Sequence, residues 1–247
     1  MNQLPTNSDK DLVTYDRRRK VLTQLQPKLF TEIDHDIFTR CAKRLSILQG
    51  SSSLLVNTEH EMFIFFDYIL YTYKKSGTNL MQRAFNNFSK NYTGEILDIF
   101  SRAKDGYFAY LEIVQAVGNE GLVVYDRERD TEHLMIDRGI NRTAKKNGKH
   151  AIVTNIIEFD DYIITTGAAI PFAVETEEGQ IVQSLFDQYY HMVKSGHATE
   201  KTRLQYITDM YKTCLLEDIT GQVSSPEVPF GSEALANRVN AQSDYTH

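Results

Sequence analysis

The stretch YFAYLEIVQA, Tyr107–Ala116, decides the fold of this chain. Aromatic, β-branched and other apolar residues dominate it, as is typical of a β-strand. It is the first of five such runs, and the others are 122–125, 133–136, 150–158 and 162–166. Three of the four separators are short and turn-like, which favours antiparallel neighbours. Residues 105–172 are therefore predicted to form a small, partly closed antiparallel β-barrel or bent sheet, of SH3-like or OB-like size.

Helical patterns flank this segment on both sides. The 247 residues divide into an N-terminal helical bundle (1–104), the β segment (105–172), C-terminal helices (173–217) and a tail (218–247) with the composition of a flexible segment. The fold class is α+β. A first helix is expected to end near Gln26, because Pro27 follows it. The link between helices and strands, around 104–106, is very short, so we expect the sheet to pack directly on the helices.

The most apolar helix of the chain is predicted over Glu59–Lys75, and we call it the central helix. Thr58-x-x-Glu61 is a capping box at its start, and Gly77 can take the left-handed conformation that ends a helix. Apolar side chains surround nearly its whole circumference, as expected of a helix buried among neighbours. Asp67 is the exception inside this apolar run, and we expect it near the seam between helices and sheet.

A buried carboxylate must find hydrogen-bond donors or become neutral. His60, Asp67 and Tyr71 share one helix face at helical spacing, with Tyr68 beside them. One interpretation is a pocket that combines an acid with phenolic hydroxyls. The other, which the sequence favours, is a structural carboxylate that ties helices together.

Four basic residues, Arg142, Lys145, Lys146 and Lys149, lie in the long connection between the third and fourth strands. They could contact phosphates of a nucleic acid beside barrel aromatics. The net charge of −6 and the pI of about 5.7 oppose such binding. Solvated charge on a hairpin loop is the alternative, and it is favoured.

Several functional classes lack their signatures in this sequence. It contains no P-loop, G-x-G-x-x-G, G-x-S-x-G or H-E-x-x-H motif. Neither a metal nor a cofactor is predicted. Cys41 and Cys214 fit reduced, buried thiols, and no secretory signal or membrane-spanning run is found. We therefore expect a soluble, cytoplasmic protein.

Two motifs also resemble those of an uncharacterised bacterial protein family. They are Asp67-Tyr68-x-x-Tyr71 in the central helix and Thr165-Thr166-Gly167-Ala168-Ala169-x-Pro171 at the end of the last strand. The resemblance covers roughly Glu59–Phe172. It implies a bacterial origin and no mechanism, since the family has no assigned activity.

Three functional hypotheses follow. The first is a non-enzymatic binding or regulatory protein that presents a helix-plus-β surface to a protein partner or a second copy of itself. The second is a small-molecule enzyme or sensor with a pocket around Asp67 at the helix/β junction. The third is nucleic-acid binding through Arg142–Lys149.

Overall fold

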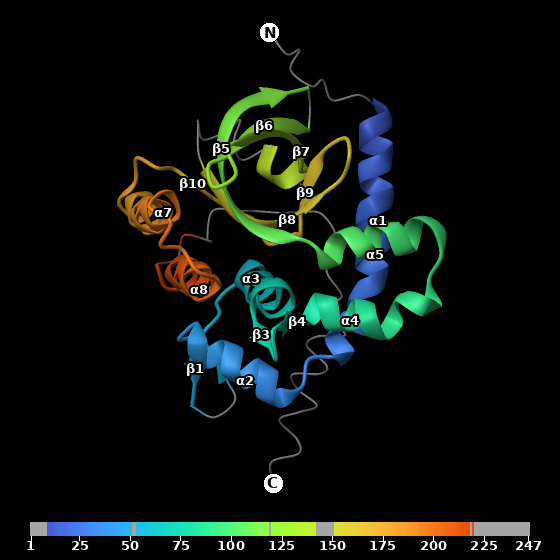
Figure 1. Ribbon diagram of the computed structural model, residues 1–247, viewed down its shortest axis with the longest axis horizontal. Coiled ribbons are helices and arrows are strands. Elements are labelled where there is room, and N and C mark those ends of the chain that lie inside the picture. Colours follow the sequence, from blue (N-terminus) through green and yellow to red (C-terminus); the bar gives the residue numbers. More distant parts are fainter. Residues whose placement is uncertain (1–8, 51–52, 119, 142–150, 218, 220–247) are drawn as a thin grey trace.

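A computed structural model describes residues 9–50, 53–118, 120–141, 151–217 and 219 of the chain. Helices surround a β-barrel, so the predicted α+β class is confirmed. In Figure 1 the barrel lies at the top, with α1 (Asp9–Thr31) on its right and α7 (Glu177–Lys194) and α8 (Glu200–Leu216) on its left. Helix α3 (Glu59–Asp67) lies beneath the barrel.

The N-terminal region combines helices with two short hairpins. Its other helical elements are α2 (His35–Arg44), the π-helix η1 (Tyr68–Thr72), α4 (Leu80–Phe88), the 3₁₀ turn η2 (Ser89–Asn91) and α5 (Gly94–Lys104). The hairpins pair β1 (Leu48–Gln49) with β2 (Ser53–Leu54), and β3 (Lys74–Lys75) with β4 (Thr78–Asn79).

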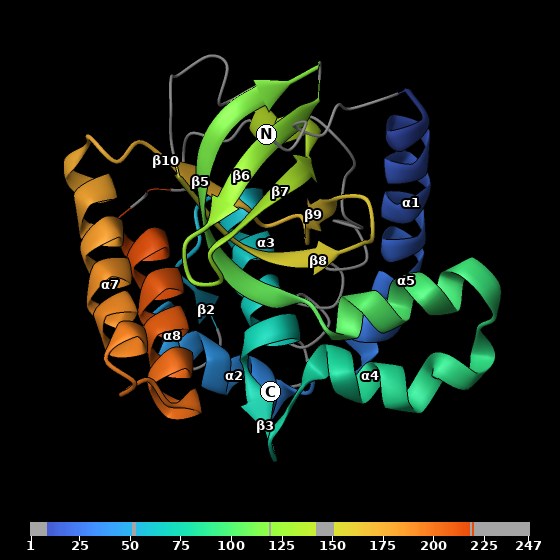
Figure 2. The same cartoon turned by 45° about the horizontal axis from the view of Figure 1, so that its top comes forward.

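Five strands close into a barrel, which Figure 2 shows from the side. They are β5 (Tyr107–Val117), β6 (Gly121–Asp126), β7 (Thr131–Ile136), β9 (Ile163–Thr165) and β8 (Ala151–Glu158), in spatial order. All neighbours are antiparallel except β7 and β9, which pair in parallel through Met135 and Ile163. A closed five-stranded Greek-key arrangement of this kind is that of an OB-type barrel. The short strand β10 (Ile170–Phe172) pairs with the start of β8, so β9 and β10 share one edge of β8.

The barrel has its own small interior, separate from the main core. Buried interior side chains come from every barrel strand and from the connection after β7; they include Leu111, Leu122, Met135, Ile140, Ile152 and Ile163. The main core instead joins the outer barrel surface to the helices, with members from α1 through α8. The expected direct packing of sheet on helices is therefore present, and the seam between them runs along β8.

Arginine 19 fixes α1 against the barrel edge. Its guanidinium donates to the Thr165 carbonyl at 2.6 Å, to the Thr165 hydroxyl at 2.9 Å and to Asp137 at 3.1 Å. It also bonds the Tyr15 hydroxyl, one turn earlier in α1, at 3.1 Å. Asp137 in turn accepts from the Ile140 backbone N–H. This network holds α1 as one wall of the seam.

Stacked aromatic rings attach α7 and α8 to the barrel. Tyr110 of β5 stacks on Phe186 of α7 with centroids 4.2 Å apart, and Tyr206 of α8 packs edge-on against Phe108 of β5 and stacks on Tyr189 of α7 at 4.3 Å. Arg203 of α8 closes the arrangement by donating to the Phe108 carbonyl at 3.1 Å. These contacts give the C-terminal helices an extensive apolar interface with β5.

Three helix predictions were wrong in detail. Helix α1 continues through Pro27 to Thr31, because its last turn carries Leu29 and Phe30 into the core. The central helix ends at Thr72 as a π-helix, and Lys74–Lys75 form a hairpin strand instead. The capping box at its start is only half formed, since Thr58 accepts from the Glu61 N–H while the Glu61 carboxylate bonds the Asn57 N–H.

Candidate functional site

Asp67, the last residue of α3, lies in the seam between the helices and the barrel and is 4% exposed. Its Oδ2 accepts from the Asn155 side-chain amide of β8 at 2.7 Å and from the Tyr211 hydroxyl of α8 at 2.6 Å. The Asn155 amide also donates to the Tyr211 hydroxyl at 2.7 Å. One carboxylate therefore joins α3, the barrel and α8.

The protonation of Asp67 is set by its burial. Loss of solvent raises the pKa of its carboxyl from 3.8 to about 6, and hydrogen bonds from Thr166, Tyr211 and Asn155 oppose this rise. None of these causes is a neighbouring positive charge. Asp67 is thus mostly ionised at neutral pH, without a cationic partner among the described residues.

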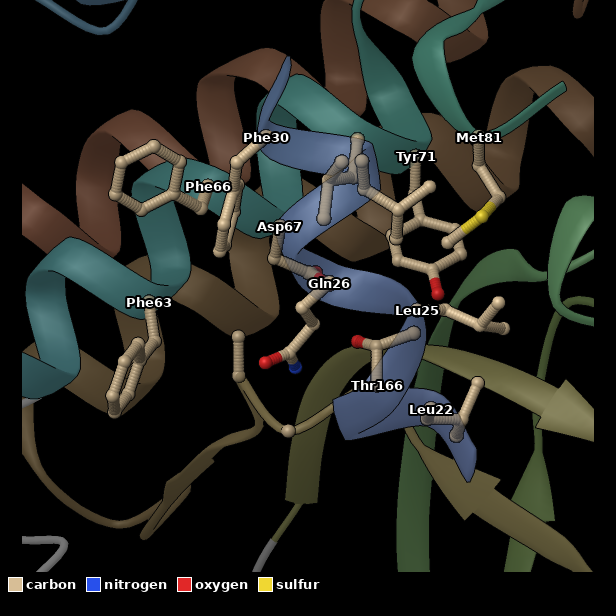
Figure 3. A pocket seen from close by; sticks show the side chains of 14 residues that line it. Leu22, Leu25, Gln26, Phe30, Phe63, Phe66, Asp67, Tyr71, Met81 and Thr166 are labelled. Carbon is tan, nitrogen blue, oxygen red and sulfur yellow. The ribbon is translucent and has the colours of Figure 1, made fainter. Parts of the chain in front are cut away.

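A narrow cavity of about 30 Å³ adjoins Asp67, enough for about one water molecule. Figure 3 shows Asp67, Gln26 and Thr166 around it, with the Tyr71 hydroxyl pointing toward the same space. Its walls are otherwise apolar or backbone, and come from α1, α3, η1, α4 and the loop before β10: Leu22, Leu25, Leu29, Phe30, Phe63, Phe66, Leu70, Met81, Gly167 and Ala168. The site is therefore a mostly apolar cavity with one acid in its wall.

Asp67 retains acceptor capacity toward this cavity. An ionised carboxylate offers about four acceptor positions. Asn155 and Tyr211 occupy two of them, both on Oδ2. The Thr166 hydroxyl has a single proton and also lies 3.2 Å from the Asn155 carbonyl, so it can donate to only one of these acceptors at a time. At least one acceptor position of Asp67 is left for a donor that enters the cavity.

The loop before β10 explains how backbone comes so close to Asp67. Between β9 and β10 the chain leaves the edge of β8, and Gly167 has φ +109°, which favours glycine. The Thr166 N–H nevertheless bonds the Asn155 carbonyl at 3.0 Å and keeps the loop in place. The motif Thr165–Pro171 thus lines the cavity through Thr166, Gly167 and Ala168.

The four residues proposed for a pocket separate into two groups. Asp67 and Tyr71 line the cavity, and burial raises the pKa of the Tyr71 hydroxyl. Tyr68 points elsewhere, to the Thr208 hydroxyl of α8 at 3.1 Å. His60 hydrogen-bonds the Ala169 backbone, and burial lowers its pKa. His60 and Tyr68 are therefore not part of this cavity.

The remaining predicted site, Arg142, Lys145, Lys146 and Lys149, lies outside the described residues. The structure does describe the hairpin tip between β8 and β9, which carries Asp160 and Asp161. Asp160 and Asp161 there bind Arg102 and Arg18 across short ion pairs of 3.0 and 2.9 Å. These carboxylates are held by arginines from α5 and α1.

Sequence reasoning missed three residues of the site. Asn155 carries a visible signal, because it is a lone amide in the apolar run of its strand. For Gln26 the sequence predicts only a helix end, and the continuation of α1 through Pro27 brings this residue to the cavity. Tyr211 has no signal of its own, since it is one aromatic residue in an apolar helical stripe.

Two further properties concern the described residues as a whole. They contain no group of three or more His, Cys, Asp or Glu side chains placed to hold a metal ion. Within the same ranges, no helix has both the length and the apolar character that crossing a membrane requires.

Comparison with known proteins identifies a family without an activity. Residues 9–220 match a family described as a family of unknown function, DUF7986. The chain has no significant match among curated proteins or among solved structures. The match extends well beyond the predicted Glu59–Phe172 on both sides, so it includes α1, α7 and α8 as well as the barrel. The chain belongs to the DUF7986 family.

Proposed function

We propose that this protein binds a small molecule and that the cavity beside Asp67 is its binding site. The observation that carries the proposal is a buried, ionisable side chain that has unused acceptor capacity and faces a cavity. Burying a carboxylate is costly unless it is fully paired. A purely structural carboxylate would use its acceptors internally, whereas a binding site keeps one for its ligand.

The size of the cavity limits how a ligand binds. Ligand pockets usually enclose several hundred Å³, whereas this one holds about 30 Å³. A head group can therefore sit at Asp67, while the remainder of the ligand lies against the partly exposed rings of Phe30 and Phe63. We propose a binding protein or sensor rather than an enzyme, because the described cavity has room for a head group but not for two reactants.

A cavity-filling variant tests this proposal. Ala168→Leu places a larger side chain in the cavity wall, whereas Ala169→Leu makes the same change at a buried neighbour that belongs to the barrel interior. Native protein should be screened by thermal shift against a library of small metabolites. A ligand should raise the melting temperature of the parent and of Ala169→Leu by at least about 2 °C. It should not raise the melting temperature of Ala168→Leu.

Two results would contradict the proposal. One is a library in which no compound stabilises the parent protein. The other is a compound that stabilises Ala168→Leu as much as the parent, since it would then bind elsewhere. Mass spectrometry of small molecules released from natively purified parent protein gives an independent readout.

The partner-binding hypothesis stays a prediction with less support. It predicts a contiguous exposed apolar patch. Among the described residues, the exposed large apolar side chains come from five separate places in the chain: Val13, Leu55, Val114, Ile181 and Leu216. Nucleic-acid binding through Arg142–Lys149 also stays a prediction, tested by retention on RNA or DNA at low salt.

We also propose a cytoplasmic location. Cys41 and Cys214 support it, because both are buried free thiols. The bacterial origin implied by the sequence motifs stays a prediction.

A further inference from the structure

We propose that the head group bound at Asp67 is a primary ammonium group, carried by an alkylamine or by a lysine side chain. This inference rests on the binding site of the proposed function, since it names the ligand class of the same cavity. A lysine outcome would replace the small molecule of that proposal with a protein segment. Its starting point is the missing counter-charge. Asp67 is buried in the seam, and the described residues around it are hydrogen-bond donors and apolar side chains without a cation.

One candidate for a counter-charge among the described residues is already engaged in other contacts. Arg19 projects from α1 toward the same seam, but its guanidinium binds Asp137, both oxygens of Thr165 and the Tyr15 hydroxyl. The positive charge of Arg19 interacts with the Tyr71 hydroxyl, and it is not among the groups that shift the pKa of Asp67. Since no cation among the described residues pairs with Asp67, we infer that its counter-charge comes from a bound molecule.

The polar groups of the cavity match the donors of an ammonium group. A primary ammonium has three N–H donors. Four polar side chains line the cavity, Gln26, Asp67, Tyr71 and Thr166, and each carries an oxygen that can accept a hydrogen bond. Gln26 is 8% exposed and lines the same cavity. A carboxylate or phosphate head group would instead be repelled by Asp67.

The apolar walls favour the same ligand class. Phe30, Phe63 and Phe66 line the crevice next to Asp67, as Figure 3 shows. The faces of aromatic rings attract organic cations, most strongly where water is excluded. A metal ion would need more oxygen ligands than this apolar cavity supplies. An alkyl chain attached to the ammonium group can lie along the phenylalanine rings.

Calorimetric titration with four-carbon probes tests the inference. Butylammonium, butanol and butyrate share one alkyl chain and differ in head group. At pH 7.5 butylammonium should bind saturably and at least tenfold more tightly than butanol, and butyrate should not bind. Asp67→Asn should weaken butylammonium at least tenfold and leave butanol nearly unchanged. Asp98 is an exposed residue of α5, and Asp98→Asn removes the same unit of charge. It should change neither the affinity for butylammonium nor that for butanol.

Protonation supplies a second readout. Binding of butylammonium to the parent should weaken as the pH falls from 7.5 to 5, because Asp67 takes up a proton. The other groups that face Asp67 do not titrate in this range. Tyr71 and Tyr211 have raised pKa values and stay neutral, and Arg19 stays charged.

Nα-acetyl-lysine methylamide separates the two sources of the head group. Binding at least as tight as that of butylammonium indicates a lysine of a protein partner, and binding at least tenfold weaker indicates a free amine. Equal binding of butanol and butylammonium would overturn the ammonium inference and leave the cavity as a ligand site. The ammonium inference also fails if a different ligand is found and butylammonium does not bind. Absence of any ligand in either experiment overturns both proposals.

Discussion

Replacing Asp67 with asparagine should stabilise the protein at pH 8 and change its stability little at pH 4. Asparagine has nearly the same shape, and its carbonyl oxygen can accept the bonds from Asn155 and Tyr211. It carries no charge in the folded or the unfolded state. The substitution therefore removes the cost of burying an ionised carboxylate and preserves the contacts of the seam.

The size of the effect follows from the pKa of Asp67. Folding raises it from 3.8 to about 6. Between these values the folded protein holds a proton that the unfolded chain has released, so the free energy of unfolding falls as the pH rises. At about 1.36 kcal/mol for each pKa unit, the full penalty is about 3 kcal/mol. Most of it develops between pH 4 and pH 7, and all of it is present at pH 8.

Urea unfolding followed by far-UV circular dichroism measures this penalty. The chain has no tryptophan, so a backbone signal is preferable to fluorescence. The free energy of unfolding of Asp67→Asn minus that of the parent should increase by about 2–3 kcal/mol between pH 4 and pH 8. For Asp98→Asn the same difference should stay within about 0.5 kcal/mol. If the difference in the free energy of unfolding between Asp67→Asn and the parent does not change with pH, Asp67 is not a buried group that titrates in this range.

Further predictions concern the contacts that form the seam. Tyr211→Phe removes a donor to Asp67 and should lower the free energy of unfolding by about 2 kcal/mol at pH 8. Because the pKa of Asp67 then rises further, the loss of stability should extend to higher pH, and urea titrations at several pH values measure both effects. Arg19→Met breaks the link from α1 to Asp137 and Thr165 and should lower the free energy of unfolding by about 3 kcal/mol, whereas Arg17→Met, whose side chain is 58% exposed, should cost less than about 1 kcal/mol. Gly179→Ala places a Cβ atom 1.9 Å from the Ala173 carbonyl oxygen and should destabilise the start of α7 by more than about 1 kcal/mol; an unchanged melting temperature would show that this turn relaxes freely.

The barrel could be predicted because each of its strands carries a local signal. Apolar runs and short turns specify antiparallel neighbours, and the observed pairs β5–β6, β6–β7 and β8–β9 follow chain order. The closure of the barrel depends on a different kind of contact. The parallel pair of β7 and β9 rests on Met135 and Ile163, which are separated by an entire strand. Local patterns contain no information about such a pairing.

Helix limits were wrong where tertiary contacts outweigh local preference. A proline inside a helix removes one hydrogen bond and costs about 3 kcal/mol, which is why the sequence predicts an end before Pro27. The next turn buries Leu29, at 3% exposure, and packs Phe30 on Phe66 with ring centroids 5.1 Å apart. Burial of two large side chains is worth a similar or larger amount. Helix α1 therefore continues and brings Gln26 to the cavity.

The candidate site was half predictable for the same physical reason. An acid in an apolar helix is visible in the sequence, because its cost is a property of the residue and its immediate neighbours. Its partners are not visible, since Asn155 and Tyr211 lie 88 and 144 residues away. The structure adds what the sequence could not, namely that these partners use only one oxygen of Asp67. Asparagine at position 67 could accept the same two bonds without the penalty of about 3 kcal/mol. The tie between α3, β8 and α8 therefore explains a polar residue at this position but not a charged one. The bound cation that we propose would explain the charge, because the ionised form that weakens the empty protein is the form that would hold this ligand.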